Sequence, residues 1–233
     1  MGQPQTDETC QCVVCGRESL FRFDPTIVTP QLKEAWVISD RLAEAFNRKE
    51  NMFCGDCGCN LRITLLAVVL IKTFSEMSGG SYDSFVELLR DKDFLKLKIA
   101  EINACGALHS YLRMHPNLYY SEWFDGIAPG ELSDGVQSED LQRLSYPDGR
   151  FDIILTSETL EHVPDPDKAW QEIHRTLKLG GYRIFTIPVL PAQLATVTRA
   201  KFVEGKRENL LAEVYHGAWV TMFVYTDFGM DLV

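Results

Sequence analysis

The sequence predicts an α/β fold, a doubly wound, mainly parallel sheet that follows a small cysteine-rich helical module. Two observations predict it. Six of the seven cysteines lie within the first 60 residues, in a segment that otherwise has helical periodicity. Beyond them, short apolar runs alternate with helical or loop segments, which is typical of strands buried on both faces of a parallel sheet. The runs are Leu97–Ile102, Leu118–Tyr120, Phe151–Leu155 and Tyr182–Ile187.

The composition indicates a globular chain with an acidic surface. Of the 233 residues, 45% are hydrophobic and 24% are charged, which excludes a disordered or fibrous protein. The formal net charge of -10 disfavours a nucleic-acid partner, unless basic groups gather in one patch. The longest apolar run, Leu65–Ile71, is too short to span a bilayer, and no secretory leader is recognisable. We therefore expect a cytoplasmic protein that does not associate with membranes.

The cysteines form two clusters whose spacings mirror each other, C-x-C-x-x-C and C-x-x-C-x-C. Thiolates two residues apart on a tight turn commonly bind one tetrahedral zinc ion. The ligands that we predict are Cys12, Cys15, Cys54 and Cys57. Cys10 and Cys59 are alternates or spares, and buried or redox-active cysteines are the alternative interpretation. Because four thiolates leave zinc no open position, the expected role of the ion is structural.

Two helices complete the predicted zinc-binding module. Pro30–Glu50 places apolar groups along one broad face, and Leu61–Met77 is a strongly apolar helix that the Gly79-Gly80 pair ends. We place the domain boundary at this pair, so that residues 1–79 form the module and residues 80–233 form the sheet domain.

Two further helices are predicted in the sheet domain. Ser81 is a plausible N-cap for a helix that runs to Leu89. A second helix begins with Asp165 as cap and Pro166 in its first turn, and the Gly180-Gly181 pair closes it. Its apolar stripe is Ala169, Trp170, Ile173 and Leu177. In sheets of this kind ligands bind at the carboxyl ends of the strands.

One segment carries a family resemblance. The stretch Phe151-Asp-Ile-Ile-Leu-Thr-Ser-Glu-Thr-Leu-Glu-His-Val-Pro-Asp-Pro, together with Leu177-Lys-Leu-Gly-Gly-Tyr, resembles the fourth and fifth motifs of class I S-adenosylmethionine-dependent methyltransferases, in particular the type 11 group. The resemblance covers about Leu97 to Pro188 and implies a Rossmann-like fold. More weakly, the cysteine-rich front end resembles zinc-binding leaders found before some of these domains.

The resemblance implies a set of cofactor-binding residues: Glu101, Asn103, Gly106, Glu122, Asp140, Leu141, Thr156, Ser157 and Glu158. Glu101 would organise the methionine end, Glu122 would accept from both ribose hydroxyls, and Asp140 would accept from the adenine amino group. The backbone N–H of Leu141 would face the adenine ring, and the backbone after the fourth strand would line the cleft. His162 is a candidate general base, with a packed or capping histidine as the alternative.

The first motif departs from the family pattern E-x-G-x-G-x-G. Asn103, Cys105 and Ala107 occupy the three glycine slots, and the nearby Gly106 sits one place off. Asparagine tolerates a left-handed backbone and alanine is small, so a variant loop remains physically possible. The departure keeps open a non-catalytic scaffold with a degenerate fold.

We expect the methyl acceptor to be a small organic molecule, bound by Pro188–Glu204 and Tyr215–Trp219, which are rich in aromatic and small residues. A zinc-assisted RNA methyltransferase is a further alternative, which the acidic net charge disfavours. Met222–Tyr225 is one candidate strand near the C-terminus, and Asp227–Leu232 looks like the start of a helix. An uncovered sheet edge would favour a homo-oligomer.

Overall fold

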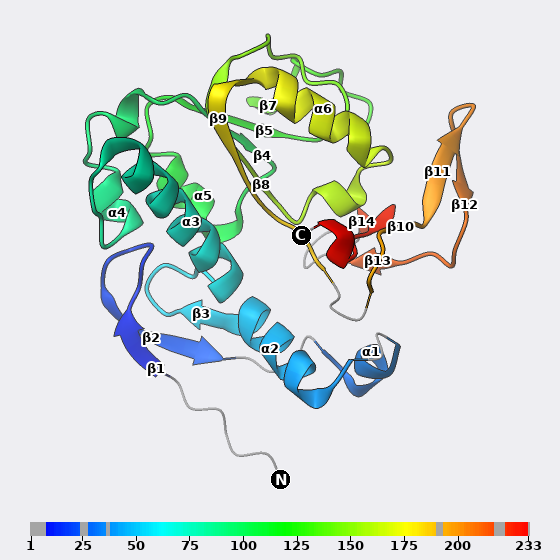
Figure 1. Ribbon diagram of the computed structural model, residues 1–233, viewed down its shortest axis with the longest axis horizontal. Coiled ribbons are helices and arrows are strands. Elements are labelled where there is room, and N and C mark those ends of the chain that lie inside the picture. Colours follow the sequence, from blue (N-terminus) through cyan, green and yellow to red (C-terminus); the bar gives the residue numbers. More distant parts are fainter. Residues whose placement is uncertain (1–7, 24–27, 36–37, 190–192, 217–221, 233) are drawn as a thin grey trace. The chain divides into compact units, whose positions relative to one another are not determined.

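A computed structural model describes residues 8–23, 28–35, 38–189, 193–216 and 222–232 (Figure 1). The chain divides into two compact units. The first contains residues 1–97 and 105–117, and the second contains residues 98–104 and 118–233. Among the helices in the described ranges, none has the length and apolar character needed to cross a membrane.

The first unit combines helices with a small antiparallel sheet. Its strands, in the order β1-β2-β3, are β1 (Glu8–Gln11), β2 (Glu18–Phe23) and β3 (Met52–Cys54). Its helices are α1 (Pro30–Ala35), α2 (Asp40–Asn51), α3 (Leu61–Ser78), α4 (Phe85–Leu88) and α5 (His109–Leu112), with the 3-10 turns η1 (Phe94–Lys96) and η2 (Gly106–Leu108). The sequence prediction missed this sheet. Burial alternates along β2, but the buried residues Ser19 and Phe21 flank the exposed Leu20, so no clean alternation of apolar and polar residues marks this strand in the sequence.

The helices of the first unit differ from prediction at their ends. The helix predicted over 30–50 is two helices, because Ser39 starts α2 by accepting a hydrogen bond from Leu42 N at 3.3 Å. Helix α3 was predicted correctly, with Gly79 ending it at φ 73°. The helix predicted from Ser81 begins only at Phe85, since Ser84 is the residue that caps it.

The second unit contains a six-stranded sheet in the order β6-β7-β5-β4-β8-β9. Its strands are β4 (Ile99–Ile102), β5 (Leu118–Glu122), β6 (Leu132–Ser133), β7 (Val136–Ser138), β8 (Phe151–Ser157) and β9 (Leu177–Thr186). All neighbouring pairs are parallel except β6 with β7. The chain runs from the central β4 outward to β5 and β7, then crosses back to β8 and β9. The predicted doubly wound, mainly parallel sheet is therefore confirmed.

Helix α6 (Pro166–Thr176) connects β8 to β9 and packs on the sheet (Figure 1). As predicted, Asp165 caps it, accepting from Lys168 N at 3.1 Å, and Pro166 occupies its first turn. The prediction for its end was wrong: the helix stops at Thr176, and the Gly180-Gly181 pair lies inside β9, where β8 and β9 pair irregularly.

A hydrophobic core fills the space between α6 and the sheet. Ala169 and Ile173 of the helix belong to one buried cluster with Phe151 and Ile154 of β8. The ring of Phe151 meets that of Tyr146 edge-on, with centroids 4.8 Å apart. The 3-10 turn η3 (Leu160–His162), which follows β8, contributes Leu160 to the same core.

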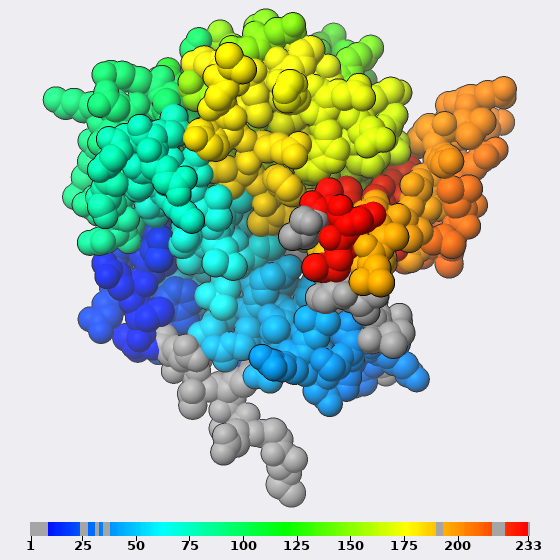
Figure 2. Space-filling model, viewed as in Figure 1, coloured from blue at the N-terminus to red at the C-terminus, as the bar shows by residue number. Residues whose placement is uncertain are grey.

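Beyond β9 the described chain forms only small elements. They are β10 (Val197–Thr198), β11 (Ala200–Val203), β12 (Lys206–Asn209), β13 (Tyr215–His216), β14 (Met222–Phe223), β15 (Thr226–Asp227) and the 3-10 turn η4 (Met230–Leu232). They pair as β10–β15, β11–β12 and β13–β14, and the β11–β12 hairpin projects from its unit (Figure 2). Within the described ranges, none of them extends the main sheet past β9.

Candidate functional site

The structure brings the four predicted zinc ligands of the first unit together. Cys12 and Cys15 lie between β1 and β2, Cys54 ends β3, and Cys57 lies in the following turn. Their four Sγ atoms all lie within 4.8 Å of one another. The Cys12–Cys57 and Cys15–Cys54 distances are 3.7 and 3.9 Å. A tetrahedral zinc ion with bonds of about 2.3 Å places its sulfur ligands about 3.8 Å apart, so the group fits such an ion.

Two equivalent turns present these thiols. Gly16 N donates to Cys12 O at 2.8 Å, and Gly58 N donates to Cys54 O at 2.9 Å. Both glycines have a left-handed backbone, with φ of 71° and 72°. Because a side chain is strained in this conformation, glycine directly after the second cysteine of each C-x-x-C pair serves the geometry of the turn.

The environment of the cluster perturbs its thiols in opposite directions. Burial raises the pKa of Cys15 to about 11. Burial acts in the same direction on Cys54, but hydrogen bonds with the Ser19 hydroxyl and with the backbone of Cys57 and Asp56 bring the pKa of Cys54 down to about 7. A bound divalent cation would favour the thiolate at every position, because metal coordination deprotonates thiols.

The remaining cysteines lie outside this group of four. Cys59 is fully buried, and its carbonyl accepts a hydrogen bond from Cys54 N at 3.0 Å. Cys10 is exposed on β1. Cys105 is fully buried. Its φ of -77° is ordinary, so this position does not require glycine or asparagine.

In the second unit, the loop after β4 has a left-handed turn at the first altered glycine slot. Asn103 has φ 60°, and its Oδ1 accepts from Trp123 N at 3.2 Å. Its own N–H donates to Ser121 O at 2.9 Å. Asparagine is one of the few residues that enter this region at low cost, so here it supplies the turn that glycine supplies in the family pattern. Glu101, two residues earlier, is completely buried in β4.

Glu122 links this loop to the end of β5. Its Oε1 accepts from Ala104 N at 2.9 Å and from the Tyr120 hydroxyl at 2.6 Å. Its carbonyl accepts from Glu139 N at 2.8 Å, which joins the end of β5 to the residue after β7. The carboxylate thus lies where the two predicted cofactor segments of β4 and β5 meet.

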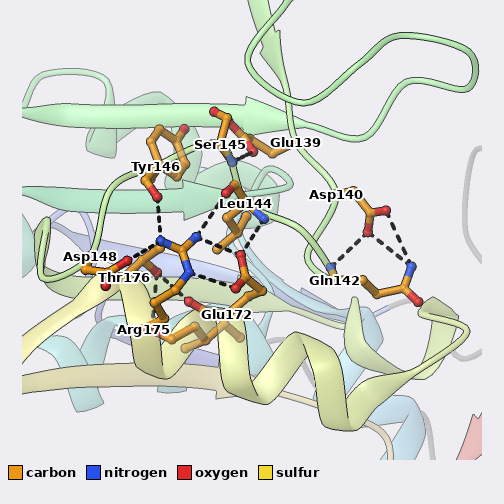
Figure 3. A network of polar contacts seen from close by, with 11 residues as sticks. Glu139, Asp140, Gln142, Leu144, Ser145, Tyr146, Asp148, Glu172, Arg175 and Thr176 are labelled. Atoms are coloured by element: carbon orange, nitrogen blue, oxygen red, sulfur yellow. Dashed lines mark hydrogen bonds and ion pairs between the residues drawn. The ribbon is translucent and has the colours of Figure 1, made fainter.

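Asp140 and Leu141 follow β7. Asp140 Oδ1 accepts from Gln142 N at 2.9 Å and from Gln142 Nε2 at 3.1 Å, forming a local turn (Figure 3). The side chain of Leu141 is buried in the core beneath the sheet end. The direction of the loop is therefore set by its own turn on one side and by core packing on the other.

The end of β8 contains a second left-handed residue. Ser157 Oγ lies 3.0 Å from Thr186 Oγ1 on β9, and Glu158 N donates to Thr186 O at 2.9 Å. Glu158 has φ 51°, an uncommon conformation for a residue with a side chain. Thr156, directly before this pair, is buried. Strained backbone of this kind concentrates at functional sites, and here it stands at the carboxyl end of the sheet.

His162 is packed rather than open. Its ring Nδ1 lies 2.8 Å from Phe223 O, which orients the imidazole, and its Nε2 lies 3.6 Å from Glu161 Oε1. Burial lowers the pKa of His162.

Gly106 lies in the first unit, where it begins η2 with φ 52° and where a Cβ would meet Ile63 Cγ1 at 3.2 Å. Packing against α3 accounts for this glycine.

Sequence reasoning did not single out three charged residues at the β7–β8 connection. They are Glu139, Glu172 and Arg175, which bind the loop of Asp140 by hydrogen bonds (Figure 3). The spacing of Glu172 and Arg175, three residues apart on a helix, was the one local signal.

The comparisons with known proteins bear on the same unit. The family model described as "Methyltransferase domain" matches residues 124–185, from just after β5 into β9. Over this segment the chain is similar to methyltransferase domains. The predicted resemblance to S-adenosylmethionine-dependent methyltransferases is confirmed by this match, which does not include the variant loop of residues 101–107.

Curated relatives of the methyltransferase domain are similar over short segments. Ubiquinone biosynthesis O-methyltransferase of Coxiella burnetii is 35% identical over 75 residues, which are 31% of this chain and 32% of the relative. 2-methyl-6-phytyl-1,4-hydroquinone methyltransferase 1 of Oryza sativa subsp. japonica is 38% identical over 52 residues, 22% of this chain and 16% of the relative. The chain thus spans about a third or less of the length of these relatives.

Among solved structures, an S-adenosylmethionine-dependent methyltransferase from Mesorhizobium loti is 20% identical, with a TM-score of 0.33. The similarity covers 55% of this chain and 67% of that one.

Proposed function

We propose that this protein transfers the methyl group of S-adenosylmethionine to a small organic acceptor. The observation that carries the proposal is the family match over residues 124–185, which falls on a sheet with doubly wound strand order. The variant first motif is compatible with it, since Asn103 supplies the left-handed turn where glycine is missing.

The proposed cofactor site lies at the carboxyl ends of β4, β5, β7 and β8. Glu122 Oε2 would accept from the ribose hydroxyls, since Oε1 already accepts from Ala104 N and from the Tyr120 hydroxyl. Asp140 would accept from the adenine amino group beside the N–H of Leu141. Glu101 and Asn103 would shape the methionine end, together with the backbone of residues 156–158.

Catalysis in this proposal rests on position. Bound S-adenosylmethionine supplies an electrophilic methyl group, and the chain contributes by holding donor and acceptor in line in a water-poor site. A base is needed only for an acceptor that loses a proton early. His162 is the candidate, because its lowered pKa keeps the ring neutral near pH 7.

For the acceptor we propose a small organic molecule. Two of the relatives are named for quinone or hydroquinone methylation, which supports a ring compound as the first class to test. The net charge of -10 supports a neutral or cationic acceptor over a nucleic acid. Whether the chain forms homo-oligomers stays a prediction, as does the division at residues 79 and 80.

We also propose that Cys12, Cys15, Cys54 and Cys57 hold one structural zinc ion in the first unit. Their sulfur spacing matches a tetrahedral ion, and four thiolates leave no position for a substrate. Cysteines that hold zinc must stay reduced, which supports the cytoplasm as the location.

Calorimetric titration with S-adenosylhomocysteine, the product form of the cofactor, tests the enzyme proposal. We expect one site per chain, and methyl transfer from radiolabelled S-adenosylmethionine to phenolic or quinol acceptors. A folded, zinc-loaded chain that binds neither form of the cofactor would reject the enzyme and favour the scaffold.

A further inference from the structure

The connection from β7 to β8 carries the proposed adenine residues on a loop without a helix. Residues 139–150 cross from one side of β4 to the other, and they contain turns and an isolated bridge between Asp140 and Arg143 but no helix or strand. Asp140 and Leu141 are at its start. Since no regular element supports this crossover, its conformation depends on contacts with the neighbouring α6.

Arg175, in the last turn of α6, makes most of these contacts (Figure 3). Its guanidinium donates to Tyr146 O at 2.8 Å, to Leu144 O at 3.0 Å and to Asp148 Oδ1 at 2.7 Å. It also forms a bidentate pair with Glu172 at 2.7 Å on both sides. Five N–H donors in one rigid plane therefore meet five acceptors.

Glu172 and Glu139 hold the same loop from two sides. Glu172 Oε2 accepts from Leu144 N at 2.9 Å, so residues of α6 hydrogen-bond both the N–H and the carbonyl of Leu144. The bond with Arg175 lowers the pKa of Glu172, which keeps the acceptor charged. Glu139, almost fully buried, accepts from Ser145 N at 2.8 Å and also from the Ser145 hydroxyl.

Residues 140–144 are thus a short closed loop between two anchors, Glu139 with Ser145 and Arg175 with Leu144. A shift of Leu144 along the chain displaces the Asp140 carboxylate, four residues away, and the Leu141 N–H, three residues away. Hydrogen bonds from a ligand to both groups would weaken after such a shift, because a hydrogen bond weakens steeply with misalignment.

We propose that Arg175 is a positioning residue for adenine recognition: through the backbone of residues 144–148 it sets the alignment of Asp140 and Leu141. The inference rests on the proposed cofactor function. The C-terminal end of α6 would then help to distinguish the 6-amino group of adenine from the 6-oxo group of hypoxanthine.

The test compares two ligands by calorimetry, S-adenosylhomocysteine and S-inosylhomocysteine, which differ in the group on C6 and in N1, which carries a hydrogen only in the oxo form. The natural chain is expected to prefer the adenine form by about tenfold or more, since Asp140 accepts a hydrogen bond that the oxo form does not donate. Arg175→Lys keeps the charge and loses the planar fork, so the preference should fall to about threefold or less.

Asp165→Ala is the matched control. It removes the N-cap of the same helix and destabilises it without touching the loop, so it should retain the natural preference. Hydrogen exchange of the ligand-free chain gives a second readout. Arg175→Lys should accelerate exchange of the amides of Gln142 and Leu144, whereas Asp165→Ala should not.

The outcomes distinguish a failure of the positioning role from a failure of the proposed cofactor function. If the natural chain binds and Arg175→Lys retains its adenine preference and its amide protection, the positioning role is overturned. If the natural chain binds neither ligand, the proposed function fails and the adenine role fails with it. Should Arg175→Lys not fold, Glu172→Gln replaces it and is expected to lower the preference in the same direction.

Discussion

Replacing Glu122 is the most direct test of the proposed cofactor site. Its Oε1 accepts two hydrogen bonds, from Ala104 N at 2.9 Å and from the Tyr120 hydroxyl at 2.6 Å. Glu122→Ala removes both, so the free energy of unfolding should fall by about 2–3 kcal/mol for this half-buried group. Loss of the ribose contacts should cost about 1.5–3 kcal/mol of binding, a roughly 10- to 150-fold weaker Kd for S-adenosylhomocysteine.

The conservative variants separate these two effects. Glu122→Gln keeps an oxygen for Ala104 N but loses the charge, so it should fold nearly normally and still bind at least about fivefold more weakly. Tyr120→Phe removes one donor to the carboxylate and should change the Kd by no more than about threefold. Calorimetry gives the Kd, and urea titration gives the stability. A folded Glu122→Gln chain with unchanged affinity would refute the ribose role and the reasoning that joins the β4 and β5 loops.

Purified protein should contain about one zinc per chain by elemental analysis, and Cys57→Ser should lose the ion and expose the first unit to proteolysis; a zinc-free natural chain would contradict the site. Asn103→Gly should retain cofactor affinity within about threefold, while Asn103→Val, strained at φ 60°, should lower it; equal affinities would show that the turn is unimportant. Burial lowers the pKa of His115 and His162 below 6.5, so the unfolded chain binds more protons at these residues than the folded chain. The free energy of unfolding should therefore decrease as the pH falls below about 6.5, and a constant value between about pH 7.5 and 5.5 would contradict this.

Much of the scaffold was predictable because it depends on local patterns. Apolar runs located β4, β5, β8 and β9, and the Asp165-Pro166 start located α6, since burial and capping act within a few residues. Element ends were predicted less well. Ser39 and Ser84 are the caps that the structure uses, and Ser81 lies close enough to Ser84 to be an equivalent candidate in the sequence.

The sequence by itself determined the four-cysteine group and the mainly parallel class of the sheet, because thiol spacing, glycine placement and apolar periodicity are properties of short segments. Only the tertiary structure decided how the candidate cofactor site is held. Glu122 reaches Ala104 across 18 residues, and Arg175 reaches Leu144 across 31. The first pair meets because the sheet brings the ends of β4 and β5 to one edge, and the second because α6 lies beside the connection from β7 to β8. No local pattern specifies which polar groups then face each other.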